Sequence, residues 1–315
     1  MKVAVTGGTG FIGKALTQVL LERGDEVFVI TRKNSGDDSS TRDDSSTSGK
    51  PLHVVTWDSL QNNLGILEGL DAIVNLAGES INQRWNDSAK ARILNSRIWA
   101  AEQVAQLVKS LEKKPHVVVN ASGISAYGIS QDEVFDESSP TAVTDFLSEV
   151  VKQWEHAADR IPAERLVKLR VGVVLADKGG AFPLMALPYR LFGGGPVGSG
   201  KQGLSWIHLH DIVRLILFCL DDDSIDGPVN ASAPQPVSND EFGRAIAKAM
   251  GRPHWFPVPA FLMRLLFGEM STLLLDGQRA VPKKSQQCGF RFQYPAIDSA
   301  MEQLVGKRQR SQRND

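Results

Sequence analysis

The chain opens with a short apolar strand that runs directly into closely spaced glycines at positions 7, 8, 10 and 13. Apolar residues then recur at helical spacing over residues 11–20, which predicts an amphipathic helix. A strand that ends in such glycines and opens a helix can hold the pyrophosphate of a dinucleotide. The reason is that the backbone approaches the phosphates closely and the helix N-terminus offers N–H groups and a positive dipole end. This pattern predicts a dinucleotide site, with a glycine turn that binds no ligand as the alternative.

The residue after the second predicted strand indicates which dinucleotide is bound. An NAD site usually places Asp or Glu at the end of that strand, about 20 residues after the glycines, to bind the ribose 2′-hydroxyl. Here the strand over 27–31 is followed by Arg32. A guanidinium pairs with a 2′-phosphate through forked, charge-assisted hydrogen bonds. The sequence therefore predicts NADP(H) rather than NAD(H), with an ordinary surface arginine as the alternative.

Composition argues against several other classes of protein. A net charge of -1 over 315 residues provides no basic field for nucleic acid or a membrane surface, so neither is expected as a partner. Two distant cysteines, Cys219 and Cys288, form neither a disulfide framework nor a zinc-ligand set. The longest apolar stretch, residues 260–275, contains charged residues and is too short to span a bilayer. Because the first strand starts at once, without a signal peptide, we expect a cytoplasmic protein.

Strand-like and helix-like segments alternate through the first half of the chain. Apolar strands, typical of a sheet buried on both faces, are predicted at 3–6, 27–31, 53–56, 72–76, 117–121 and 166–174. Helices are predicted at 11–23, 89–111 and 146–158. This alternation predicts an α/β fold with a Rossmann-type, doubly wound parallel sheet.

The organisation along the chain predicts two domains and two irregular segments. Residues 1–178 form the expected dinucleotide-binding domain, interrupted by a polar segment at 33–50 that we expect to be a mobile loop, with an acidic regulatory segment as the alternative. Residues 179–305 are richer in Pro and Gly and form the expected smaller α/β substrate lobe, partly built from segments that return to the sheet. Its C-terminal unit spans about 251–305, and 306–315 is expected to be a flexible basic tail.

Three further segments carry a resemblance to a known family: Asn75-Leu76-Ala77-Gly78, Ser125-Ala126-Tyr127-Gly128 and Gly289-Phe290-Arg291-Phe292. Together with the N-terminal glycines, they make the chain similar to the extended short-chain dehydrogenases/reductases. It resembles most closely the atypical branch called the epimerase family, sugar nucleotide epimerase-like proteins with a short C-terminal domain of unknown function. The resemblance covers almost the whole chain. It implies an oxidoreductase or epimerase-like activity and says little about the substrate.

The resemblance also implies roles for individual residues. The pyrophosphate would be held by Gly7, Thr9, Gly10, Phe11, Ile12 and Gly13. Arg32 would meet the 2′-phosphate, and Asp58 would reach the adenine amino group, although Asp58 could equally be a turn residue. The ribose and nicotinamide side would be lined by Leu76, Ala77 and Gly78.

The acid/base residues of the family do not occur in their usual pattern. Typical members use Ser or Thr with a Tyr-x-x-x-Lys pair, in which the lysine lowers the tyrosine pKa. None of the three tyrosines in this chain has a lysine four residues later. If Glu155 takes the place of the family's helix glutamate, Leu147 and Val151 occupy the Tyr and Lys positions. Gly123 occupies the serine position, four residues before Tyr127.

Other groups near the expected nicotinamide are therefore candidates for the chemistry. We select Ser122 and Tyr127 as catalytic candidates, with Ser125 and Glu79 as further ones. A packing role is the alternative for Tyr127, because geometry must be known before a catalytic role is assigned.

Two more motifs suggest binding sites. Residues 195–202 resemble a phosphate-binding loop but lack its final Ser or Thr, so we expect a flexible glycine loop that could clamp an anionic substrate. His208 and His210 would share one face of a strand, but no third ligand stands at suitable spacing, so we predict no metal site. Asp211 is expected to cap the helix that follows.

The sequence as a whole favours an NADP(H)-dependent oxidoreductase or epimerase-like enzyme that acts on a small molecule, with nucleotide sugars suggested by fold analogy alone. The alternative is a non-catalytic NADP(H)-binding redox sensor that lacks the Tyr-x-x-x-Lys pair. A purely structural interaction protein ranks last, because it leaves the glycines and Arg32 unexplained. A homodimer is possible through helices 89–111 or 146–158, although simple packing on the sheet would give the same pattern.

Overall fold

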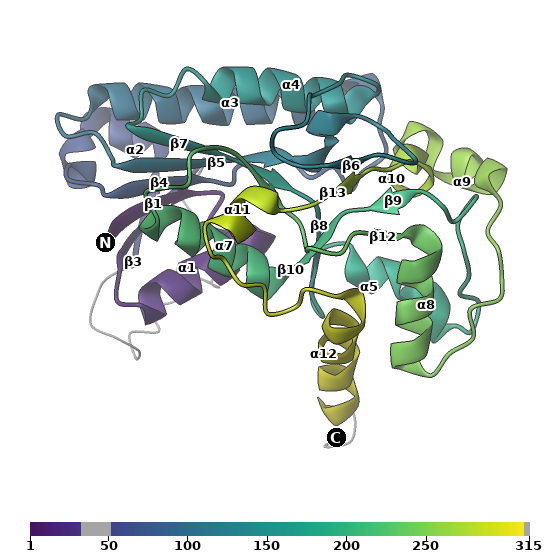
Figure 1. Ribbon diagram of the computed structural model, residues 1–315. Coiled ribbons are helices and arrows are strands. Elements are labelled where there is room, and N and C mark those ends of the chain that lie inside the picture. The colour runs from purple at the N-terminus through teal and green to yellow at the C-terminus, as the bar shows by residue number, and fades with distance from the viewer. Residues whose placement is uncertain (33–51, 312–315) are drawn as a thin grey trace.

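A computed structural model describes residues 1–32 and 52–311 of the chain. Its centre is a seven-stranded, fully parallel sheet in the order β11-β7-β5-β4-β1-β2-β3 (Figure 1). The strands are β1 (Lys2–Thr6), β2 (Glu26–Thr31), β3 (Leu52–Thr56), β4 (Ala72–Asn75), β5 (Val117–Gly123), β7 (Arg165–Val171) and β11 (Gly227–Ala231). The strand order reverses between β1 and β4, which is where sheets of this kind bind ligands. This architecture confirms the predicted Rossmann-type, doubly wound α/β fold.

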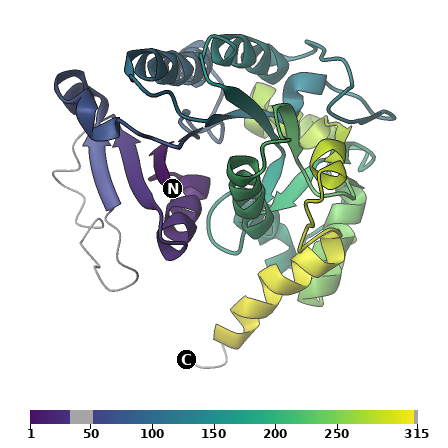
Figure 2. The ribbon, with the colours of Figure 1, turned by 60° about the vertical axis from the view of Figure 1, so that its left-hand side comes forward.

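Helices cover both faces of the sheet. Figure 1 shows α3 (Asp87–Ser110) and α4 (Phe146–Ala158) above it, and α1 (Phe11–Glu22) and α7 (Leu209–Asp221) below it. Figure 2 shows α1 and α7 side by side, and their apolar faces pack with the sheet valines into one buried cluster. The opposite face is closed by α3 together with the short helices α2 (Trp57–Asn62) and η1 (Leu64–Leu67). Burial on both faces explains why most of the strand sequences are continuously apolar.

The start of α4 shows how local chemistry fixes the ends of an element. The Asp145 side chain accepts a hydrogen bond from the Ser148 backbone N–H at 2.9 Å, and the Ser148 hydroxyl accepts one from the Asp145 N–H at 2.9 Å. This reciprocal cap satisfies two N–H groups that a helix start otherwise leaves unpaired. The helix spans the residues that the apolar periodicity predicts.

The predicted strand over 166–174 is wrong in one respect, because it divides at Gly172. A Cβ at this position would lie 2.6 Å from the Ser205 carbonyl oxygen, so only glycine allows the chain to pass here. The chain leaves the main sheet after β7, and β8 (Val173–Leu175) pairs instead with β10 (Trp206–His208). The division directs the second half of the chain away from the sheet and into the smaller lobe.

The smaller lobe has its own core. Phe182, Trp206, Phe242 and Met301 are buried there against one another and their neighbours. Its elements are α5 (Phe182–Met185), α6 (Leu187–Arg190), β9 (Gly203–Leu204), β12 (Val237–Ser238), α8 (Asn239–Met250) and α12 (Ile297–Ser311). Within the range 179–305, α7 and β11 return to the main sheet. The proposed division after residue 178 stays a prediction.

Short elements connect the lobe to the sheet domain. Strand β13 (Arg279–Ala280) pairs with β6 (Val134–Phe135), which follows the short helix η2 (Ile124–Tyr127) after β5. The remaining helices are α9 (Ala260–Phe267), η3 (Gly268–Ser271), α10 (Thr272–Leu275) and α11 (Lys283–Gln287). The backbone pairing of β6 with β13 brings the segment after β5 next to the C-terminal unit.

Several expectations concern the ends and gaps of the described chain. The loop predicted at 33–50 lies outside the described residues. The basic tail predicted from residue 306 begins inside α12, which runs to Ser311, and 312–315 lie outside the described residues. Within residues 1–32 and 52–311, none of the helices combines the length and apolarity that crossing a bilayer requires.

Candidate functional site

The glycine turn after β1 is shaped so that side chains cannot be added. Gly7 adopts a left-handed backbone with φ of 70°, and a Cβ there would lie 2.8 Å from the Leu76 carbonyl group. A Cβ on Gly13 would lie 2.2 Å from the Gly7 oxygen. The Gly10 N–H donates to this same oxygen at 2.9 Å and closes the turn. The turn therefore lies close to the end of β4 and opens directly into α1, as a pyrophosphate cradle requires.

Other residues predicted to hold the pyrophosphate surround this turn. Thr9 and Gly10 are exposed, and Phe11 and Ile12 are half-buried at the start of α1. The ring of Phe11 packs under the backbone of Gly179 and Gly180, where an added Cβ would approach it to 3.0 and 2.8 Å. The structure thus brings the first turn of α1 together with the start of the second lobe.

A buried chain of polar side chains supports the crevice from below. The Thr6 hydroxyl donates to Asn75 Oδ1, and Asn75 Nδ2 donates to Asn120 Oδ1 at 2.6 Å. Asn120 Nδ2 donates in turn to the Ala121 carbonyl at 2.7 Å. These side chains come from the carboxyl ends of β1 and β4 and from the middle of β5, and they are fully buried. Sequence reasoning missed them, although a polar residue in each apolar strand was a visible signal.

The two residues predicted to contact the adenosine half of the cofactor lie just after two neighbouring strands, β2 and β3. Arg32 follows β2, is exposed, and directly precedes the segment 33–51 that lies outside the described residues. Asp58 is exposed in the first turn of α2, after Thr56 has capped that helix. Arg32 follows β2, which pairs with β1 on the side opposite β4, and Asp58 follows β3, which pairs with β2 at the edge of the sheet. Their contacts with a cofactor stay predictions.

The positions of the family's acid/base residues are apolar and packed. A Cβ on Gly123 would lie 3.1 Å from a methyl group of Val151, so these two positions face each other across β5 and α4. Val151 is buried, and Leu147 packs against Trp85, Ile93 and Val150. None of these groups can exchange a proton with a substrate. Any proton transfer at this site must therefore use other side chains.

Ser122 is held in an ionic network beneath the site. Its hydroxyl donates to Glu155 Oε1 at 2.6 Å, and Arg170 binds both oxygens of the same carboxylate at 2.8 and 2.9 Å. Burial acts to raise the pKa of Glu155, but the hydrogen bonds and charge of Arg170 outweigh it and hold this pKa below its ordinary value. Ser122 is 4% exposed, so its hydroxyl is committed to a buried carboxylate.

Tyr127 is packed inside the protein. It is 2% exposed, stacks on Phe135 with ring centroids 5.0 Å apart, and donates its hydroxyl to Asn230 Oδ1 at 2.8 Å. Burial raises the pKa of Tyr127, against the opposing charge of Arg170, which lies over the ring. These contacts favour the packing role over the catalytic one. Ser125 is half-buried in η2.

The segment after β4 is fixed to α3 by two side chains. The Glu79 backbone N–H donates to the Ser96 hydroxyl at 2.9 Å, and Arg97 donates to the Glu79 carbonyl at 3.0 Å. Leu76 and Ala77 are half-buried, and Gly78 is exposed at the surface of this segment. The predicted ribose and nicotinamide wall is therefore a well-supported backbone strip beside the crevice.

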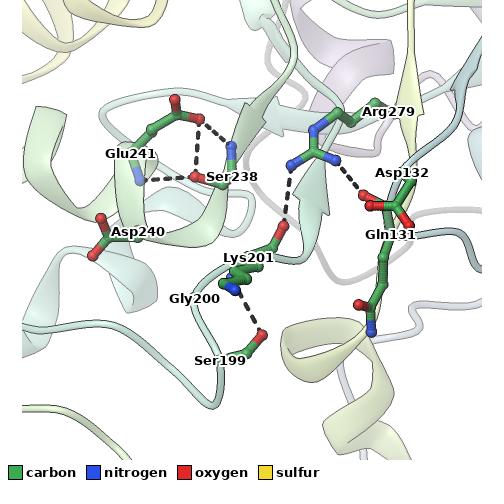
Figure 3. A pocket seen from close by; sticks show the side chains of 9 residues that line it. All are labelled: Gln131, Asp132, Ser199, Gly200, Lys201, Ser238, Asp240, Glu241 and Arg279. Atoms are coloured by element: carbon green, nitrogen blue, oxygen red, sulfur yellow. Dashed lines mark hydrogen bonds between the residues drawn. The ribbon is translucent and has the colours of Figure 1, made fainter.

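A polar cavity of about 540 Å³ lies between the two lobes' loops (Figure 3). The Arg279 guanidinium links the two sides of this cavity, because it donates to the backbone carbonyls of Gln131 and Lys201. The lining residues come from the loop after η2, the glycine loop and the start of α8: Gln131, Asp132, Ser199, Gly200, Lys201, Ser238, Asp240 and Glu241. Charges of both signs suit a small polar molecule. The sequence indicated the glycine loop, but the other walls required the fold.

His208 has a structural role at the start of α7, whereas the His210 side chain is exposed. His208 caps α7 by accepting the His210 N–H at 3.1 Å, so the prediction that Asp211 caps this helix is wrong. Asp211 is instead buried in the first turn and accepts backbone N–H groups from Gln293 and Tyr294, each at 2.8 Å. Within the described ranges 1–32 and 52–311, no cluster of three or more potential metal ligands occurs.

Comparisons with known proteins agree with this geometry. Residues 3–168 match the NAD dependent epimerase/dehydratase family, and residues 258–304 match a domain of unknown function (DUF1731). The epimerase family protein YfhF of Bacillus subtilis is 41% identical over 313 residues, which cover 98% of this chain and 99% of that protein. The epimerase family protein SDR39U1 of Bos taurus is 39% identical over 312 residues, or 97% of this chain and 100% of that protein.

Solved structures show the same similarity. The crystal structure of human epimerase family protein SDR39U1 with NADPH has a TM-score of 0.86 and 36% identity, covering 97% of this chain and 99% of that chain. MoeE5 in complex with UDP-glucose and NAD has a TM-score of 0.75 at 19% identity, covering 99% of this chain and 100% of that chain. The second likeness concerns the fold alone.

Proposed function

Because the chain belongs to the NAD dependent epimerase/dehydratase family, as an atypical epimerase-family member with the C-terminal domain of unknown function, we propose that it binds NADP(H) and acts on a small molecule. The observation that carries the proposal is the glycine turn, where a Cβ on Gly7 or Gly13 would strike the backbone. Selection of NADP(H) over NAD(H) is supported by Arg32 after β2 and by the NADPH in the human relative.

Each part of the crevice has a role in this proposal. The N–H groups at the start of α1 would bind the pyrophosphate, and Arg32 would bind the 2′-phosphate. The strip of Leu76, Ala77 and Gly78 would line the nicotinamide half. When bound, the cofactor supplies or accepts a hydride. The buried Thr6, Asn75 and Asn120 chain keeps the strand ends in place beneath it.

The cavity between the lobes is the proposed substrate site. Lys201 and Arg279 supply cationic groups, whereas Asp132, Asp240 and Glu241 supply carboxylates. The pKa of Asp240 is lowered by its hydrogen bond to Arg244, so it stays an acceptor for ligand hydroxyl groups at neutral pH. A polyhydroxylated small molecule such as a sugar derivative fits this lining, and the nucleotide-sugar class rests on fold analogy.

A non-catalytic NADP(H)-binding redox sensor is the second candidate. It is favoured by the apolar contact between the Gly123 and Val151 positions, where a proton-transfer group would be required. Ser122 and Tyr127 are both buried and hydrogen-bonded, so neither replaces that group without a rearrangement. A homodimer through α3 or α4 fits either function and stays a prediction.

Rapid mixing distinguishes the two functions. The NADPH-loaded protein would be mixed with a panel of carbonyl metabolites and nucleotide sugars while the absorbance of the bound nicotinamide is recorded. Net oxidation identifies a reductase and its substrate class, whereas a transient decrease that recovers identifies an epimerase. A flat record across the panel, with NADPH firmly bound, contradicts the enzyme and supports the sensor. A Lys201→Met variant should lose the response to anionic compounds if the cavity is the substrate site.

A further inference from the structure

Arg97 occupies an unusual position on α3, facing the site. One of its terminal nitrogens donates to the backbone carbonyls of Glu79 at 3.0 Å and Ile93 at 2.8 Å. Its guanidinium lies over the Trp154 ring, 5.1 Å from the ring centroid. A Cβ on Gly78 would lie 3.2 Å from the central carbon of this guanidinium. Arg97 is thus enclosed between the strip after β4 and helix α4.

The positive charge of Arg97 is not neutralised by an ion pair with an acidic side chain among the described residues. Among residues 1–32 and 52–311, no acidic group lies within ion-pair distance of Arg97. The nearest candidate, the Glu79 carboxylate, lies 3.9 Å from Arg92 instead. Burial lowers the pKa of Arg97 to about 10, and Glu79 offsets only part of this effect, so the side chain stays protonated at neutral pH. A half-buried cation without an ion-pair partner acts more strongly than a solvated one on any charge that changes nearby.

The position of Arg97 relative to the crevice indicates which changing charge it would act on, namely that of the nicotinamide ring. The glycine turn packs on Leu76, at the end of β4, and Gly78 follows two residues later against Arg97. A dinucleotide held at the turn crosses the carboxyl end of β4 at this switch point. The other neighbour of Arg97 is Trp154. Trp154 lies about one helical turn after Val151 on α4, and Val151 occupies the position of the family's lysine. Arg97 therefore puts a cation beside a site from which the family's lysine is missing.

We propose that Arg97 is a positioning residue that sets which redox form of the cofactor is bound. The oxidised nicotinamide ring carries a positive charge and the reduced ring carries none, so a fixed cation beside it disfavours NADP⁺ relative to NADPH. The proposal rests on the proposed function, because it requires NADP(H) at the glycine turn. It makes the resting protein an NADPH-loaded one.

The test is a pair of equilibrium titrations of the full chain with NADPH and with NADP⁺, monitored by calorimetry. In Arg97→Gln, the ratio of the NADP⁺ dissociation constant to that of NADPH should fall by about tenfold, which is the effect that Coulomb's law gives for two unit charges about 12 Å apart at an effective dielectric constant near 20. For a two-electron couple this fall corresponds to a decrease of about 30 mV in the midpoint potential of the bound cofactor. Arg97→Lys keeps the charge and should hold the ratio within about twofold of the wild-type value.

Matched variants separate charge from packing. Arg92→Gln removes the same charge from an exposed position on the same helix and should leave the ratio unchanged. If Arg97→Gln fails to fold, Arg97→Met keeps an apolar stem over Trp154 and serves as the uncharged variant. An unchanged ratio in the uncharged variant overturns the inference, as does an equal loss of both cofactor forms in Arg97→Gln and Arg97→Lys. Wild-type protein that binds neither form overturns the proposed function as well.

Discussion

Arg170 on β7 binds both carboxylate oxygens of Glu155 on α4, at 2.8 and 2.9 Å, and this pair fixes the helix to the sheet beside the site. Both side chains are largely buried, with 5% and 12% of their surface exposed. The Ser122 hydroxyl donates to the same carboxylate. This network ties the end of β5 to α4. Removing Glu155 or Arg170 leaves the charge of the other residue buried without a partner.

Glu155→Gln should therefore destabilise the protein by about 3–5 kcal/mol, because the Arg170 cation loses its partner. The measurement is urea denaturation at neutral pH. The double variant Glu155→Gln/Arg170→Met should recover part of the loss, since it removes both charges. A single variant as stable as wild type would show that the pair contributes little.

The same pair gives a pH dependence of known sign. Because the folded-state pKa of Glu155 lies below its ordinary value of 4.5, the carboxylate contributes stability that is present above that value. This contribution is lost as the pH falls through the folded-state pKa. The difference in stability between wild type and Glu155→Gln should therefore shrink in acid. A difference that stays constant down to the acid transition would contradict the lowered pKa.

His116 provides a pH dependence of opposite sign. Hydrogen bonds to Asp223 at 2.7 Å and Glu164 at 3.0 Å raise the pKa of His116 above its ordinary value of 6.5. Its contribution to stability is fully present below pH 6.5 and is lost as the pH rises through the folded-state pKa. The group is exposed, so salt should weaken the effect. The melting temperature of His116→Gln, compared with wild type from pH 5 to pH 9, checks this: the two curves should converge in base.

Tyr127→Phe separates a packing role from a catalytic one. Loss of the buried hydroxyl leaves Asn230 Oδ1 without this donor and should cost about 1–3 kcal/mol of stability. We expect cofactor affinity, and the pH profile of any turnover found, to stay as in wild type. A fall in turnover of about a hundredfold or more at unchanged stability would instead assign the phenol a role in proton transfer.

The extent to which sequence predicts this protein depends on the range of the interactions involved. Local patterns were sufficient for six of the seven strands of the main sheet, all except β11, and for α4, whose start is fixed by Asp145 and Ser148 within one turn. The break at Gly172 was not predictable, because the atom that forbids a side chain belongs to Ser205, far along the chain. Asp211 was misassigned for a related reason: its partners, the N–H groups of Gln293 and Tyr294, come from the C-terminal unit.

The candidate site shows the same division. The glycine turn is a local motif, and the fold places it where the motif requires. Arg97 was not recognised from sequence, because an arginine on a helix is usually solvated and only the packing of Gly78 and Trp154 shows that it is enclosed and half-buried. The cavity beside Arg279 joins segments that are far apart in the chain, with Gln131 and Arg279 separated by 148 residues, so no spacing in the sequence indicates it.

Gly13→Ala tests whether the cradle depends on the missing side chain. Its Cβ would lie 2.2 Å from the Gly7 oxygen, so the turn must open, and NADPH affinity should fall by at least about tenfold. Gly65→Ala is the matched control, because the nearest atom to its Cβ is the Asn63 side-chain oxygen at 3.9 Å. Calorimetric titration of both variants gives the comparison. Equal NADPH affinity in the two would show that the turn does not contact the cofactor.

The most direct measurement is the ratio of NADH to NADPH dissociation constants for the wild-type chain and for Arg32→Ala. Wild type should bind NADPH at least about tenfold more tightly than NADH, because Arg32 pairs with the 2′-phosphate that NADH lacks. Arg32→Ala should bring the ratio close to one by weakening NADPH alone. Absence of binding to either nucleotide, or a ratio that Arg32→Ala leaves unchanged, would contradict the assignment of this crevice to NADP(H).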